Sequence, residues 1–267
     1  MSTNILAKII GHKKIEVAER KTQISVAQLE AMPLFNQVGH SLKLNLLNSD
    51  LTGIIAEFKR QSPSKGVIND TASVAEVANA YTQFGAAGIS VLTDKTFFGG
   101  SMDDLSVAVK NPIPVLRKEF IIDEFQLLEA KAYGASVILL IAACLTPTET
   151  HSLARFAKSL GLEVLLEIHD ATEIGHISDT VDFVGINNRS LKSFEVNIEH
   201  SLQLKNQLPK NILSIAESGI YSLETFLLLK KEGFDGFLMG EYFMKQANPA
   251  AAFEAFFKSI KTDNNAV

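Results

Sequence analysis

The stretch SVILLIAACLTPTETHSLARFAKSLGLEVLL, residues 136–166, contains the structural unit that predicts the fold of the whole chain. Its ends, Ser136–Ile141 and Glu163–Leu166, are short and almost continuously apolar, which is typical of parallel strands buried on both faces. Between them, the pair Thr146-Pro147 marks the start of a helix. The apolar positions that follow have the i, i+3, i+4, i+7 spacing of one helix face: Leu153, Phe156, Ala157 and Leu160. The stretch therefore predicts a strand, a helix and a second strand.

Eight apolar runs of this kind occur after residue 52, each followed by a candidate helix. They are Gly53–Phe58, Ile89–Leu92, Ile113–Leu116, Ser136–Ile141, Glu163–Leu166, Phe183–Ile186, Ile212–Ile215 and Gly236–Met239. Eight strand–helix units in about 210 residues are typical of a (β/α)8 barrel, and we predict an α/β fold of this TIM-barrel type. A doubly wound sheet is the alternative, but the chain has neither the G-x-G-x-x-G turn nor the P-loop that often marks such sheets.

Residues 1–52 precede the repeat, and no Gly-, Ser- or Pro-rich linker separates them from the first strand. We therefore expect a helical extension docked on a catalytic barrel of residues 53–261, followed by a frayed C-terminus at residues 262–267. Within the extension we predict helices at Ile5–Lys21 and Val26–Met32, and a helix or an irregular connection at Leu42–Asn48.

The composition excludes several classes of protein. Of the 267 residues, 46% are hydrophobic and 21% are charged, which is enough to bury a sizeable core and is unlike a disordered chain. The net charge of −5 argues against a protein that binds nucleic acid through its overall charge. The single cysteine cannot form an internal disulfide, which favours a cytoplasmic protein.

The sequence also argues against a membrane protein. No apolar run approaches the roughly 18–20 residues that span a bilayer, and lysines interrupt the apolar start that a secretory signal would need. The basic segment Ile5–Lys21 could lie on a membrane surface, but we favour a helix packed on the barrel with its lysines in solvent. No exposed apolar helix face is evident, so we expect a monomer.

Barrel active sites lie at the carboxyl ends of the strands, so polar residues that end the apolar runs are site candidates. Glu57 and Lys59 are two apart at the end of the first run, which places both side chains on the face that points into the barrel. A charged pair buried there needs partners or a ligand to offset its desolvation; a plain ion pair at the rim is the alternative. Most other runs also end in charged or amide residues: Lys118, Glu167, Asn187, Arg189, Glu217 and Glu241.

Small residues follow the seventh and eighth runs, at Ser218-Gly219 and Gly240. They let backbone N–H groups approach an anion, and we expect a helix N-terminus after each, which is the usual phosphate position in such barrels. Tight turns without a ligand are the alternative. The histidines show neither H-x-H nor H-E-x-x-H spacing, so we expect no metal site.

Ile54–Gly66, IIAEFKRQSPSKG, is similar to the first-strand signature I-A-E-x-K-x-x-S-P-S-x-G of the indole-3-glycerol phosphate synthases. Further segments resemble this family in the expected order: Val91–Ser101, Leu116–Phe120, Glu163–Asp170, Ile186–Arg189 and Ala216–Ile220. The resemblance implies a (β/α)8 barrel with an N-terminal helical extension, and no cofactor or metal. It implies ring closure of a phosphorylated small molecule, 1-(2-carboxyphenylamino)-1-deoxyribulose 5-phosphate, which loses CO2 and water to give indole-3-glycerol phosphate in tryptophan biosynthesis.

The resemblance also implies catalytic roles. Lys118 resembles the general acid that protonates the ketone oxygen of the substrate, and Glu167 resembles its acid–base partner during dehydration. Lys59 would hold the carboxylate of the substrate, while Glu57 and Asn187 would orient its hydroxyl groups.

The substrate-binding positions follow in the same way. Arg189 would support the catalytic cluster electrostatically, and Phe98 and Phe120 would flank the aromatic ring of the substrate. The positions that match phosphate contacts are Ser62, Ser218, Gly219 and Gly240.

Two questions about charge arise from these positions. Lys59 and Arg189 would lower the pKa of Lys118 while Glu167 would raise it, so the sequence leaves the net direction open. After Gly240 many members of the family have Ser, whereas this chain has Glu241. A carboxylate would repel phosphate, so we expect Glu241 to point away and backbone N–H groups alone to bind there.

Two other functions would require a different set of residues. Phosphoribosylanthranilate isomerase, another phosphosugar barrel enzyme, would need a Cys/Asp pair at the ends of the first and sixth strands, where this chain has Glu57 and Asn187 instead. A non-catalytic relative would be expected to have lost some of the catalytic positions. All four of the principal ones are present: Lys118, Glu167, Lys59 and Glu57.

Overall fold

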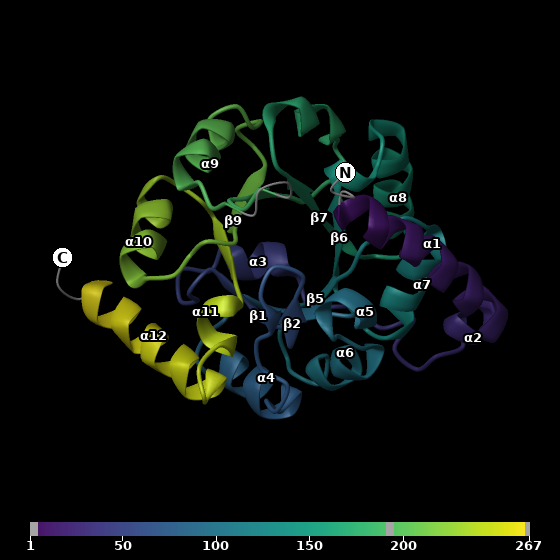
Figure 1. The fold of residues 1–267 in the computed structure, drawn as a ribbon, viewed down its shortest axis with the longest axis horizontal. Coiled ribbons are helices and arrows are strands. Elements are labelled where there is room, and N and C mark those ends of the chain that lie inside the picture. The colour runs from purple at the N-terminus through teal and green to yellow at the C-terminus, as the bar shows by residue number, and fades with distance from the viewer. Residues whose placement is uncertain (1–4, 191–194, 265–267) are drawn as a thin grey trace.

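The computed structural model describes residues 5–190 and 195–264. Parallel strands close into a barrel in the order β1-β10-β9-β8-β7-β6-β5-β4, and β1 pairs with both β10 and β4. The strands are β1 Ile54–Phe58, β4 Gly88–Leu92, β5 Val115–Lys118, β6 Val137–Ile141, β7 Glu163–Ile168, β8 Phe183–Asn187, β9 Leu213–Glu217 and β10 Gly236–Met239. Helices surround them (Figure 1). The predicted (β/α)8 barrel is confirmed.

The longer helices cover the outside of the barrel. They are α4 Val74–Gln83, α6 Met102–Ala108, α7 Glu124–Ala132, α8 Pro147–Ser159, α9 Ile198–Lys205, α10 Leu223–Lys231 and α12 Pro249–Asn264. As predicted, α8 begins at Pro147, and Thr146 is its N-cap. Shorter elements at the strand ends are β2 Gln61–Ser62, β3 Gly66–Val67, α5 Lys95–Phe98, η1 Ala142–Cys144, η2 Ala171–His176 and α11 Glu241–Met244.

Two helical segments differ from the prediction. The helix expected after the fifth barrel strand is only the 3-10 segment η2, in which β-branched residues and Gly175 are weak helix formers. At the other end of the chain, α12 continues to Asn264, past residue 261 where we expected the folded barrel to end. The rest of the segment expected to fray, residues 265–267, lies outside the described residues.

Several strands continue beyond the apolar runs that predicted them. The predicted runs end at residues 116, 166, 186 and 215, whereas β5, β7, β8 and β9 continue to Lys118, Ile168, Asn187 and Glu217. The apolar pattern stops early because the last inward positions are polar and face the mouth of the barrel. Lys118, Glu167 and Glu217 are thus carried by strands, which hold them more rigidly than loops would.

The amino end of the barrel is closed by α3 Leu42–Leu46, in the segment for which the sequence left helix or irregular structure open. Leu42 is buried and packs with barrel-interior residues such as Ile55 and Leu116. Gly88 and Gly236 make room for α3. A Cβ atom at Gly88 would lie 3.1 Å from Leu42 Cδ1, and one at Gly236 would lie 3.0 Å from Leu46 Cδ2. The apolar interior therefore fills the amino end and leaves the carboxyl end for a site.

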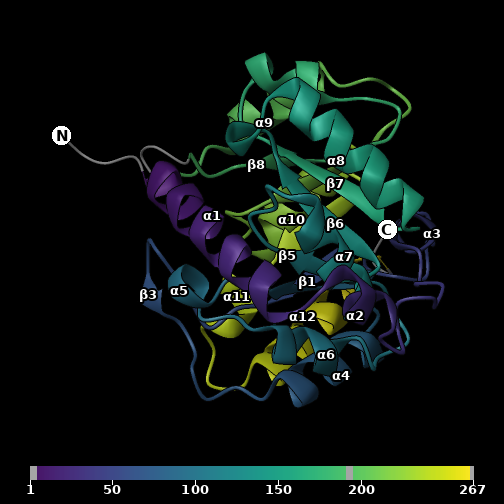
Figure 2. The same ribbon diagram turned by 90° about the vertical axis from the view of Figure 1, so that its right-hand side faces the viewer.

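The extension begins with α1 Ile5–Gln23 and continues with α2 Val26–Glu30, close to the predicted bounds. In Figure 2, α1 lies at the same end of the barrel as the β2–β3 hairpin, while α3 lies at the opposite end. Within the described residues, no helix is both long enough and apolar enough to cross a membrane.

A buried ion cluster joins α1 to the barrel. Lys13 is fully buried, and its Nζ lies 3.0 Å from Asp94 Oδ2, 3.0 Å from Glu119 Oε1 and 2.8 Å from Glu16 Oε2. Burial alone would lower the pKa of Lys13, but Glu119, Asp94 and Glu16 together raise it. The expectation that the lysines of this helix lie in solvent is therefore wrong for Lys13.

Replacing Lys13 with Met should lower the free energy of unfolding by about 3–5 kcal/mol, because the buried carboxylates of Asp94 and Glu119 lose the cation that compensates them. Urea denaturation followed by circular dichroism measures this change. Lys14→Met is the matched control, since Lys14 is exposed on the same helix and its substitution should change stability far less. Equal effects of the two substitutions would contradict the role of the ion cluster.

Candidate active site

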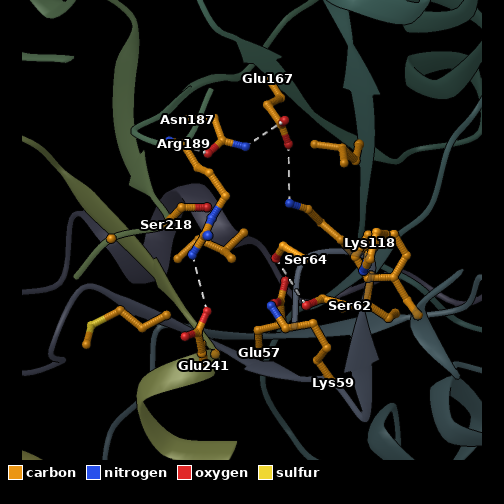
Figure 3. A pocket seen from close by; sticks show the side chains of 18 of the residues that line it. Glu57, Lys59, Ser62, Ser64, Lys118, Glu167, Asn187, Arg189, Ser218 and Glu241 are labelled. Carbon is orange, nitrogen blue, oxygen red and sulfur yellow. Dashed lines mark hydrogen bonds and ion pairs between the residues drawn. The ribbon is translucent and has the colours of Figure 1, made fainter. Parts of the chain in front are cut away.

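One pocket at the carboxyl end of the barrel brings the predicted site residues together (Figure 3). It is lined by every one of them: Glu57, Lys59, Ser62, Phe98, Lys118, Phe120, Glu167, Asn187, Arg189, Ser218, Gly219 and Gly240. The sequence missed the contribution of α1, whose Ile5, Leu6 and Ile9 also line the pocket. The extension is thus part of the pocket wall.

Lys118 lies between carboxylates at the mouth of the barrel. Its Nζ donates to Glu217 Oε2 at 3.0 Å and to Glu167 Oε2 at 3.3 Å. Burial would lower the pKa of Lys118, but Glu217, Glu167 and Glu57 outweigh burial and raise it. The direction that the sequence left open is therefore upward, and Lys118 is an ammonium group.

Glu167 is held from several sides. Its Oε1 accepts a hydrogen bond from Asn187 Nδ2 at 3.0 Å, and Lys118 contacts its other oxygen. Burial would raise the pKa of Glu167, but Lys118, His169 and Asn187 lower it. The group is therefore an ionised carboxylate.

Glu217 was a candidate as a polar residue at the end of an apolar run, but the sequence assigned it no role; the structure makes it a member of this cluster. It is buried at the end of β9, and its Oε1 lies against Gly185, where any side chain would collide with it. Burial, together with Glu167 and Glu57, raises the pKa of Glu217 to about 7, although Lys118 opposes the shift. Ile215 and Glu217 are two apart on the strand and share one face, and this spacing could have indicated from the sequence that Glu217 points into the barrel.

Glu57 and Lys59 form an ion pair, with Lys59 Nζ 2.7 Å from Glu57 Oε1. Glu57 Oε2 also accepts from Ser90 Oγ at 3.4 Å. Burial would raise the pKa of Glu57, but Lys59 and Lys118 lower it. Both residues line the pocket, as their spacing on the strand predicted, and the pair also fits the alternative of an ion pair near the rim.

His169 lies beside Glu167 and was not predicted to take part. Its Nε2 is 3.1 Å from Glu167 Oε1, and its Nδ1 is 3.6 Å from Glu173 Oε2. Burial alone would lower the pKa of His169, but Glu167 and Glu173 raise it to about 10. The imidazolium thus bridges a carboxylate of the pocket to one outside it.

Phe98 and Phe120 line the pocket and contact each other there, with ring centroids 5.9 Å apart and planes inclined by 39°. Their backbones are fixed by the two carboxylates that hold Lys13. The Phe98 N–H donates to Asp94 Oδ1 at 3.2 Å, and the Phe120 N–H donates to Glu119 Oε1 at 2.8 Å. The buried ion cluster therefore also positions the aromatic pair.

The loops predicted to bind phosphate differ in detail from the prediction. Ser218 and Gly219 have left-handed backbones, with φ of 65° and 71°. The helix after them starts only at Leu223, so no helix N-terminus follows directly; α11, in contrast, starts immediately after Gly240. Ser218 is held by Asn188 Nδ2, which donates to its carbonyl oxygen at 2.7 Å.

Glu241 also lines the pocket, contrary to our expectation that it points away. Its Oε2 is 3.2 Å from Arg189 Nη2, and its Oε1 is 3.9 Å from Lys65 Nζ. Arg189 Nη2 donates to Tyr221 Oη at 2.6 Å as well. Figure 3 shows Glu241 and Arg189 directed toward each other. Arg189 and Lys65 thus compensate the negative charge of Glu241 in the pocket.

The fold and the pocket together define a (β/α)8-barrel enzyme whose site combines cationic groups, carboxylates and an aromatic pair. The family model of indole-3-glycerol phosphate synthase matches residues 6–256. The chain belongs to this family.

Relatives support the assignment over almost the full length. An indole-3-glycerol phosphate synthase of Bacteroides thetaiotaomicron is 45% identical over 261 residues, which cover 97% of this chain and 99% of that protein. One from an Exiguobacterium species is 44% identical over 251 residues, covering 93% of this chain and 94% of that protein.

Solved structures with lower identity share the fold. The alpha subunit of tryptophan synthase from Legionella pneumophila has a TM-score of 0.62 at 14% identity, covering 85% of this chain and 98% of that chain. Orotidine 5'-phosphate decarboxylase from Pyrococcus horikoshii has a TM-score of 0.53 at 13% identity, covering 70% and 92%. At such identities the likeness shows the barrel architecture alone.

His169 should contribute stability that depends on pH. Its folded-state pKa is raised from 6.5 to about 10, so its protonated form stabilises the fold fully below pH 6.5, and this contribution is lost as the pH rises to about 10. The excess in unfolding free energy of the wild type over His169→Gln should therefore shrink across that range, as measured by urea denaturation. His151→Gln, an exposed position, is the control. A difference that grows with pH would contradict this assignment.

Proposed function

We propose that the chain catalyses the reaction for which its family is named: closure of the indole ring of 1-(2-carboxyphenylamino)-1-deoxyribulose 5-phosphate. The products are indole-3-glycerol phosphate, CO2 and water. The observation that carries this proposal is a buried ammonium, Lys118, in contact with the carboxylates of Glu167 and Glu217 in a pocket that also holds an aromatic pair.

Lys118 is proposed as the general acid of ring closure. As the ring carbon that bears the carboxylate attacks the ketone carbon, the C–C bond forms and negative charge develops on the ketone oxygen. The Lys118 ammonium donates a proton to this oxygen, which becomes a hydroxyl group. A positioned general acid of this kind typically contributes ~10²–10⁴-fold to the rate. The raised pKa of Lys118 ensures that it enters the reaction protonated.

Decarboxylation and dehydration complete the sequence. Loss of CO2 leaves its bonding electrons in the ring and restores aromaticity. The new hydroxyl then leaves as water, together with a proton from the neighbouring carbon. Glu167 is proposed to move protons in this step, because it is ionised, lines the pocket and is held in place by Asn187 and Lys118.

The remaining pocket residues are proposed to bind the substrate. Lys59 would hold the carboxylate, Glu57 and Asn187 would orient the hydroxyl groups, and Arg189 would add positive charge. Phe98 and Phe120 would flank the aromatic ring, a role supported by their place in the pocket wall. The phosphate would bind at Ser62, Ser218, Gly219 and Gly240, all of which line the pocket. Since the proposed steps move only protons, CO2 and water, we propose no cofactor and no metal.

We also propose that the enzyme works as a monomer in the cytoplasm. Support for the monomer is that a single chain supplies acid, base, aromatic and anion-binding groups to the pocket. Support for the compartment is the single cysteine, Cys144. Sedimentation equilibrium tests the first statement directly.

The test of function adds the anilino-deoxyribulose phosphate to purified protein and follows indole fluorescence. Lys118→Met should lower kcat by about 10²–10⁴-fold, because the proton donor is lost. Lys258→Met, an exposed lysine on α12, should keep the wild-type rate. No signal from the wild type would overturn the function; full activity of Lys118→Met, shown to be folded by circular dichroism, would overturn the mechanism.

A further inference from the structure

The principal cations of the pocket are already paired with carboxylates. Lys59 pairs with Glu57 at 2.7 Å, and Lys118 pairs with Glu217 and Glu167. The third cation contact joins Arg189 Nη2 to Glu241 Oε2 at 3.2 Å. A substrate with a carboxylate and a phosphate must therefore compete with carboxylates of the protein itself.

Glu241 differs from the other carboxylates in exposure and in chemistry. Its side chain is 21% exposed, compared with 5% for Glu57 and Glu167 and 1% for Glu217. The proposed reaction gives Glu241 no proton to move. Of these four carboxylates, Glu241 is therefore the one that can most readily turn out of the pocket into solvent, where water compensates its charge.

The loops proposed to bind phosphate meet at this one carboxylate. Glu241 itself follows Gly240, and Lys65, 3.9 Å from Glu241 Oε1, lies in the turn that also holds Ser62. Arg189 connects Glu241 to Tyr221, which lies in the same loop as Ser218 and Gly219. The carboxylate occupies the point where these loops could surround an anion.

We propose that Glu241 is a specificity-determining residue that acts as an internal competitor for phosphate. In the free enzyme its carboxylate engages Arg189 and Lys65, and the phosphate group of the substrate displaces it. The proposal rests on the proposed function, which assigns phosphate to these loops.

Displacement has a consequence for selectivity. Inorganic phosphate would have to displace Glu241 from Arg189 and Lys65, and it makes no contact elsewhere in the pocket that would offset the loss of these ion pairs. The complete substrate would add the contacts of its ring with Phe98 and Phe120 and of its carboxylate with Lys59. Glu241 therefore keeps free phosphate from occupying the pocket while admitting the larger molecule.

Titration calorimetry with inorganic phosphate tests this without turnover. Glu241→Gln removes the negative charge at nearly constant volume and should tighten phosphate binding about tenfold, an effect that weakens at high salt. Glu241→Ser should also tighten phosphate binding. Glu254→Gln is the matched control: it makes the same change in net charge on the exposed surface of α12 and should leave the affinity unaltered.

A second measurement asks whether Glu241 acts through its ion pair. On an Arg189→Gln background, Glu241→Gln should give a clearly smaller gain in phosphate affinity, because the cation that the carboxylate neutralises is gone. Unchanged or weaker phosphate binding by Glu241→Gln would overturn the proposal, since a residue that merely positions Arg189 would lose affinity when removed.

The two sets of measurements distinguish a failure of this inference from a failure of the proposed function. If the wild type turns over the anilino-deoxyribulose phosphate but Glu241→Gln does not bind phosphate more tightly, this inference fails and the function stands. If Glu241→Gln gains phosphate affinity while the wild type gives no indole fluorescence, the function fails and the internal competition stands.

Discussion

Strands that end in charged residues can close into a barrel only if those charges compensate one another at its mouth. Lys118 satisfies this constraint for β5, since its ammonium lies between Glu167 on β7 and Glu217 on β9. Removing ions from water costs several kcal/mol each, so an unmatched member of this group would destabilise the barrel. The same compensation leaves an ammonium and ionised carboxylates in a pocket, which are the groups that proton transfer requires.

The N-terminal extension obeys the same constraint. Lys13 is buried because α1 lies over Asp94 and Glu119, and these carboxylates in turn accept backbone hydrogen bonds from Phe98 and Phe120. The Lys13 ammonium thus helps to dock the extension, beside the ion pairs of Arg20 and Lys21, and it holds the carboxylates that position the aromatic pair. The extension is therefore coupled to the site through charge as well as through the apolar contacts of its first turns.

The ion pairs of the pocket form two groups that differ in burial. The inner group, around Lys118 and Glu57, is the more buried, so its charges interact strongly and shift the pKa of Lys118 upward and that of Glu167 downward. The outer pair, Glu241 with Arg189, is partly exposed and can be exchanged for a ligand at lower cost. An acidic chain with a net charge of −5 can bind an anionic molecule because cations converge locally at the pocket.

The barrel and most residues of the site could be predicted from the sequence. Its alternation of short apolar runs with helical spacing predicted the strand–helix repeat, and the polar residues that end the runs included Lys118, Glu167 and Asn187. These signals are local, because they depend on spacing along one strand or helix. The tertiary structure alone decided the partners: Lys118 contacts residues 49 and 99 positions away, which only closure of the barrel brings within reach.

For the same reason, the sequence could not predict the direction of the pKa shift of Lys118 or the contact of Glu217 with Lys118. Nor could it predict the burial of Lys13 or the pairing of Glu241 with Arg189. Each depends on which opposite charges lie within a few ångströms and on how much water the surrounding elements exclude. Periodicity predicts that a side chain points inward. Only the closed barrel determines what that side chain meets there.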